Sequence, residues 1–80
     1  MPALDDNAKL VLRTIVEQDM DGYTLARQTG LKTEDLEKAV DMLSANDLLR
    51  VKGDQRGPRF LESWFQAVPG AKHLLLSIFR

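Results

Sequence analysis

The sequence predicts a small α+β domain that is mostly helical. Before residue 49, three stretches repeat apolar residues at the spacing of a helix. Apolar and basic residues then alternate over 49–52, which is the period of a half-buried strand. A loop dense in turn-forming residues follows and indicates a hairpin. Because 80 residues suffice for one thin core, we expect a single domain over 1–80.

The first helix is expected to begin after Asp5 or Asp6, because a carboxylate at either position can cap it. Its apolar side chains recur at intervals of three and four residues and therefore form one stripe. The stripe consists of Leu4, Ala8, Val11, Leu12, Ile15 and Val16. Residues 20–22 break this pattern.

Two further helices are expected before residue 48. Tyr23 and Thr24 are predicted to be extended, with Thr24 capping a brief helix that ends at Gly30, since glycine tolerates the left-handed conformation of a tight turn. The third helix is predicted to begin at Lys32 or Thr33 and to end at Asn46 and Asp47, which also tolerate that conformation. The residues expected in the core from this region are Leu25, Ala26, Leu31, Leu36, Ala39, Val40 and Leu43.

A hairpin is expected after the third helix. Its first strand is predicted at 49–52, with Val51 turned toward the core. Residues 53–58 are predicted to form a projecting loop, because the segment is too long for a two-residue turn. Residues 59–62 are predicted to be the return strand, with Phe60 pointing inward.

The last segment, 63–80, is expected to be a C-terminal extension of a core that spans 5–62. Ser63 opens a short capping-box match, which predicts the start of a helix. Apolar residues at helical spacing predict a closing helix over 71–79, and a strand over 74–79 is the alternative.

The composition excludes several classes of protein. The net charge is -1, which argues against a uniformly basic nucleic-acid binder. The sequence has no cysteine, so disulfides and thiolate chemistry are excluded and a cytoplasmic location is expected. No apolar run approaches the length of a membrane span. His73 is the single histidine and lies in no catalytic, phosphate-binding or metal-binding motif. We therefore expect a non-enzyme without cofactor, metal or small-molecule substrate.

A family resemblance comes from residues 23–43, which show the order Leu-Ala, Gly-Leu, apolar residue, Leu. The tripeptide Asp-Leu-Leu at 47–49 and a basic hairpin follow. Over about residues 8–62, the chain resembles the winged helix-turn-helix family of bacterial and archaeal transcription regulators. The resemblance implies a three-helix core, a wing of two or three strands and a closing C-terminal helix. It also implies that members that bind DNA insert the third helix into the major groove and touch the backbone with the wing.

The resemblance implies contact residues on two elements. The candidates on the third helix are Thr33, Glu34, Glu37, Lys38 and Asp41. The candidates on the wing are Arg50, Lys52, Arg56 and Arg59. Carboxylates on the helix repel phosphates, whereas the wing cations fit either phosphates or an acidic protein surface. The alternative is that the helix acids favour the helix dipole and the basic residues protect an exposed sheet edge.

Aromatic and aliphatic residues concentrate near the C-terminus. Two interpretations are open: these side chains pack within one molecule, or they form an interface with a second copy or another protein. The candidate interface residues are Trp64, Phe65, Leu75, Leu76 and Phe79.

Two functions follow from these observations. The first is a dimerising winged-helix module for protein–protein interaction or regulation, whose partner is another protein or a second copy. The second is a transcription regulator that binds double-stranded DNA, with phosphate contacts from the wing. The acidic third helix and the overall charge favour the first, and the family resemblance favours the second. Neither function involves a membrane.

Overall fold

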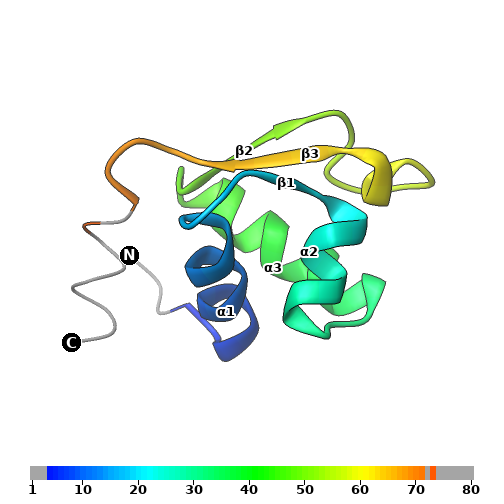
Figure 1. The fold of residues 1–80 in the computed structure, drawn as a ribbon, viewed down its shortest axis with the longest axis horizontal. Coiled ribbons are helices and arrows are strands. Elements are labelled where there is room, and N and C mark those ends of the chain that lie inside the picture. The colour runs from blue at the N-terminus through cyan, green and yellow to red at the C-terminus, as the bar shows by residue number, and fades with distance from the viewer. Residues whose placement is uncertain (1–3, 72, 74–80) are drawn as a thin grey trace.

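Three helices lie on one side of a three-stranded antiparallel sheet in the computed structural model, which describes residues 4–71 and 73 (Figure 1). The helices are α1 (Asp6–Ile15), α2 (Gly22–Thr29) and α3 (Thr33–Ala45). The strands are β1 (Met20–Asp21), β2 (Leu49–Lys52) and β3 (Trp64–Ala67), and a 3-10 turn, η1 (Phe60–Glu62), precedes β3. The predicted α+β class and the three predicted helices are confirmed.

The first and third helices begin where the sequence predicts. Asp5 caps α1, because its side-chain oxygen accepts a hydrogen bond from the backbone N–H of Ala8 at 2.7 Å. α3 begins at Thr33, and Asp47 adopts a left-handed conformation with φ of 57° just beyond its end. The buried residues of the two helices follow the predicted stripes: Ala8, Val11, Leu12 and Ile15 in α1, and Leu36, Ala39, Val40 and Leu43 in α3.

The start of α2 differs from the prediction. Met20 and Asp21 are the extended residues, not Tyr23 and Thr24, because the first two pair with β3. The side chain of Asp21 accepts a hydrogen bond from the backbone N–H of Thr24 at 3.3 Å, so Asp21 has the capping role predicted for Thr24. The helix ends as predicted at Gly30, whose φ is 72°.

The return strand of the hairpin lies at Trp64–Ala67, so its prediction over 59–62 is wrong. The segment predicted as the return strand forms the turn η1 instead. This turn buries Phe60, whose ring centroid lies 5.3 Å from that of Phe65. The predicted helix start at Ser63 is also wrong, because the next four residues form the central strand in the order β1-β3-β2. A buried aromatic residue in a short segment fits a strand and a 3-10 turn equally well, which explains the error.

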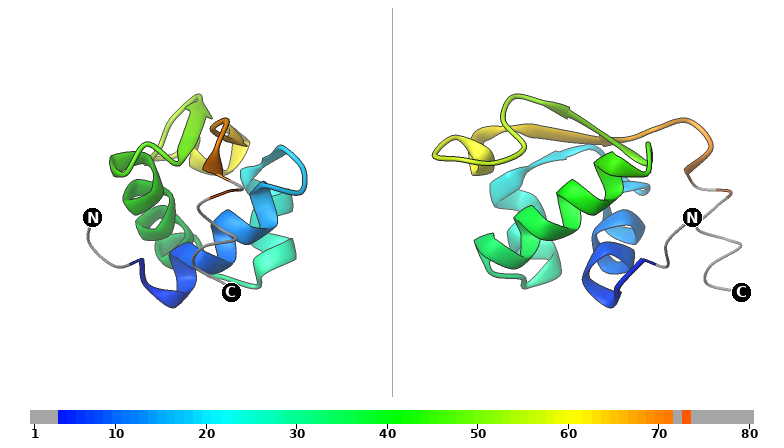
Figure 2. Two further views of the ribbon diagram at one scale, coloured as in Figure 1. Left: turned by 90° about the vertical axis from the view of Figure 1, so that its left-hand side faces the viewer. Right: turned by 180° about the vertical axis from the view of Figure 1, so that it is seen from behind.

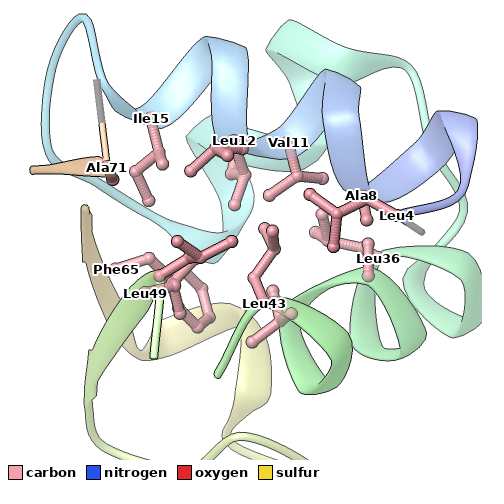
Figure 3. Close-up of a cluster of buried hydrophobic side chains, with 14 of the residues drawn as sticks. Leu4, Ala8, Val11, Leu12, Ile15, Leu36, Leu43, Leu49, Phe65 and Ala71 are labelled. Carbon is pink, nitrogen blue, oxygen red and sulfur yellow. The ribbon is translucent and has the colours of Figure 1, made fainter. Parts of the chain in front are cut away.

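Helices and sheet enclose one core (Figure 3). Leu12, Leu43 and Phe65, from α1, α3 and β3, are each 0% exposed. The two views of Figure 2 show the described helices on the same side of the sheet. Ala71 also joins the core. Apart from Ala71 and His73, the predicted closing helix or strand lies outside the described residues.

Candidate nucleic-acid interface

The outward side of α3 is acidic. Thr33, Glu34 and Lys38 are exposed, and Glu37 and Asp41 are half-buried. The opposite side of the helix packs into the core, so these five predicted contact residues share one accessible surface. They carry three carboxylates and one ammonium group, which gives the bare helix surface a negative charge.

Arg56, in the 53–59 loop between β2 and η1, lies against this acidic side of α3. Its Nε and Nη2 atoms both lie 2.5 Å from Oδ2 of Asp41. The hydrogen bond to Asp41 and the charge of that carboxylate raise the pKa of Arg56 above its usual value, and Glu37 adds a smaller charge effect. Gln55, the preceding residue, donates a hydrogen bond from Nε2 to Oγ of Ser44. The loop therefore contacts the C-terminal half of α3 at two points.

The base of the 53–59 loop is fixed by the buried hydroxyl of Ser63. Its Oγ accepts a hydrogen bond from the backbone N–H of Asp54 at 2.7 Å and lies 2.9 Å from the backbone oxygen of Asp54 and 3.0 Å from that of Arg59. A Cβ on Gly53 would lie 2.5 Å from this Oγ, and the φ of Gly53 is 123°. Ser63 and Gly53 thus shape the loop, a role that the sequence pattern did not predict.

The structure separates the four predicted wing cations. Arg50 and Lys52 lie on β2 and point away from the helices, opposite Gln66 and Trp64 of β3. Arg56 is engaged by Asp41, as described above. Arg59 lies in the loop and lines a hollow together with Lys52. Within the described residues, Arg50, Lys52 and Arg59 form no ion pair, so their charges are available to a partner.

The predicted oligomer interface is corrected in part. Phe65 is 0% exposed and belongs to the core, because its side chain points inward from the central strand. Trp64, its neighbour, points outward and is 44% exposed. The other three predicted interface residues, Leu75, Leu76 and Phe79, lie outside the described residues.

The described part of the chain shows neither a metal-binding cluster nor a membrane-spanning helix. It holds no group of three or more His, Cys, Asp or Glu residues able to bind a metal ion. None of its helices has the length and apolar character needed to cross a membrane.

Comparison with known proteins supplies one structural likeness. The fold is similar to that of BpsR from Bordetella bronchiseptica, whose DNA binding is regulated by 6-hydroxynicotinic acid. The TM-score is 0.78 at 18% sequence identity, and the match covers 95% of this chain and 53% of the BpsR chain. At that identity the likeness establishes the fold alone, and this chain spans about half the length of BpsR. The sequence matches no protein-family model and none of the curated proteins.

Proposed function

We propose that this chain is a winged-helix domain of a transcription regulator that binds double-stranded DNA. In this proposal α3 enters the major groove, and β2, the 53–59 loop and β3 form the wing. The observation that carries the proposal is the fold: its structural neighbour at a TM-score of 0.78 is a DNA-binding protein. The basic loop beside α3 adds support, because cations next to an inserted helix suit the phosphate backbone.

The phosphate contacts come from the wing cations that form no ion pair within the described residues: Arg50, Lys52 and Arg59. Arg59 and Lys52 line one hollow, together with Gly53, Asp54 and Ser63. Thr33 and Lys38 donate hydrogen bonds from the exposed side of α3 to bases or phosphates. Arg56 acts differently, because it neutralises Asp41 and thereby lowers the negative charge that α3 presents to DNA.

The remaining acids of α3 set a requirement on the sequence of the DNA. Glu34 is exposed and Glu37 is half-buried, and neither forms an ion pair within the described residues. A carboxylate in the major groove accepts a hydrogen bond from N4 of cytosine but repels phosphates. We therefore expect weak binding to most sequences and tighter binding where cytosines lie opposite these two side chains.

A titration with duplex DNA at several salt concentrations tests the proposal. The domain is expected to bind with an affinity that falls steeply with salt. Arg59→Glu is expected to weaken binding to every duplex and to reduce the salt slope by about one phosphate contact. Lys9→Glu, the same charge change on α1, is expected to leave the affinity and the salt slope unchanged. Absence of binding at low salt, or equal effects of the two variants, would contradict the proposal.

A second candidate is a protein-interaction module that dimerises or binds a regulatory partner. The exposed acids of α3 favour it, since they fit a basic protein surface without the repulsion that phosphates impose. Sedimentation of the chain at several concentrations separates the two candidates. A concentration-dependent dimer together with no duplex binding at low salt favours the interaction module.

A further inference from the structure

Strand β2 is an edge strand with one unpaired side. β3 pairs with it from Leu49 to Lys52, and no described strand pairs with its other side. The four residues contain no proline or glycine that would prevent pairing. The unpaired N–H and C=O groups of such an edge can accept the backbone of another extended segment.

A groove borders β2. It is lined by β2 itself, by Gln66 of β3, and by Ser44, Asp47 and Gln55, which come from α3, its C-terminal turn and the 53–59 loop. Val51 also lines the groove and is only half-buried, although its side chain points toward the core. A strand added here would cover the exposed part of Val51 with its own inward-pointing side chains.

The charges along β2 specify the chemistry of that strand. Arg50 and Lys52 lie on the outward face, about 6.8 Å apart by the rise of a strand, and pair with no described acid. Asp47 and Asp54 flank the strand in sequence and line the same groove. Acidic residues two positions apart would face the two cations, and basic residues at both ends would suit the flanking carboxylates.

We propose that β2 accepts an extended segment of a partner protein as a fourth strand, with two alternate acidic residues opposite Arg50 and Lys52. A peptide satisfies the free backbone groups of the edge as well as the two cations, whereas a nucleic acid satisfies only the cations. This site shares Arg50 and Lys52 with the proposed phosphate contacts of the wing, whereas its backbone contacts along the edge of the sheet are separate from those of α3 and Arg59.

A blocked peptide with the sequence Lys-Val-Glu-Val-Glu-Val-Lys provides the first test. Trp64 is the single tryptophan and lies opposite Lys52, so its fluorescence reports binding at this edge. The peptide is expected to give a saturable change below about 1 mM. The peptide Glu-Val-Lys-Val-Lys-Val-Glu has the same composition with the charges exchanged and is expected to bind at least several-fold more weakly, by about the effect of two surface ion pairs.

N-methylation of the peptide distinguishes strand addition from simple charge attraction. Successive amides of a strand point to opposite sides, so methylation of either the Val or the Glu amides is expected to abolish binding while methylation of the other set spares it. Equal binding of both methylated peptides would overturn the proposal. So would equal binding of the charge-exchanged peptide, or absence of a fluorescence change.

Protein variants locate the site. Arg50→Gln/Lys52→Gln is expected to weaken peptide binding by about tenfold, from two lost ion pairs. Lys9→Gln/Arg27→Gln removes the same charge from the helices and is expected to leave peptide binding unchanged. Equal effects of the two double variants would contradict the assignment. A thymidylate octamer that displaces the peptide at a lower concentration would instead assign this edge to nucleic acid and overturn the proposal.

Discussion

The outward side of α3 and the 53–59 loop form adjacent parts of one surface but are held in different ways. α3 is anchored by a buried side of four apolar residues, whereas every residue of the loop is exposed. The loop is positioned by polar contacts: Arg56 to Asp41, Gln55 to Ser44, and Ser63 at its base. The two parts also carry opposite charge. A firmly packed acidic helix thus determines where the basic loop lies.

The largest effect is expected where α3 is packed. Leu43→Ala removes a side chain that is 0% exposed and leaves a cavity among α1, α3 and the sheet, so it is expected to cost about 2–5 kcal/mol of unfolding free energy. Leu36→Ala is expected to do the same. Glu34→Ala, on the exposed side of the helix, should change stability by less than about 0.5 kcal/mol. Denaturant unfolding checks all three, and equal midpoints would show that α3 is not anchored in this way.

A smaller loss is expected where α2 packs against η1. A Cβ on Gly22 would lie 2.6 Å from the Cα of Leu61, so Gly22→Ala forces the backbone of η1 to move and is expected to cost about 2 kcal/mol. Gly30→Ala is the control, because it meets nothing within 4 Å and bears only the strain of its φ of 72°. Thermal unfolding compares them. A Gly22→Ala variant as stable as the wild type would contradict the close approach of α2 and η1.

A substitution at the base of the 53–59 loop is expected to have the next smaller effect on stability. Ser63→Ala removes a hydroxyl that serves the backbone N–H of Asp54, so a loss of about 1 kcal/mol is expected, with faster hydrogen exchange at the Asp54 amide. Ser44→Ala removes only the exposed contact with Gln55 and is expected to leave stability and the Asp54 amide unchanged. Unchanged exchange at Asp54 in Ser63→Ala would mean that another contact fixes the loop.

The smallest effect concerns the cap of α2. The hydrogen bond with the Thr24 side chain is the main cause that lowers the pKa of Asp21. Burial opposes this effect, and the hydrogen bond from the Thr24 backbone N–H adds to it. A lowered pKa in the folded state means that the stabilisation is present above the unfolded pKa and is lost as the pH falls through the folded pKa. Asp21→Ala is expected to cost about 1 kcal/mol or less at pH 7 and a smaller amount at strongly acid pH, where the carboxyl is protonated. A cost independent of pH would exclude the charged cap.

The helical half was predictable from the sequence because helical periodicity is a local property. The stripes that end at Ile15 and Leu43 required no knowledge of partners, and both are buried as predicted. The start of α2 was misplaced, because Asp21 becomes a cap only once Met20 has paired with β3, which is distant in sequence. Long-range pairing of this kind leaves no local pattern.

The same reason explains the errors in the candidate site. Residues 64–67 begin with two adjacent aromatic residues and do not alternate apolar with polar side chains, so Phe65 was assigned to an interface although it is the inward residue of the central strand. The pairing of Arg56 with Asp41 joins residues that are 15 positions apart across a loop. The sequence predicted a basic hairpin beside an acidic helix. Only the fold shows which cations of the hairpin remain unpaired.

The most direct measurement of the proposed function is an NMR titration of the isotopically labelled chain with duplex DNA at low salt. If DNA binds as proposed, the largest chemical-shift changes are expected at the 53–59 loop and at the exposed residues of α3, with Arg59 and Lys38 among the most affected. The buried side of α1 should change little. Changes confined to α1 or to the β2 edge, or no change at any duplex concentration, would contradict DNA binding through this surface.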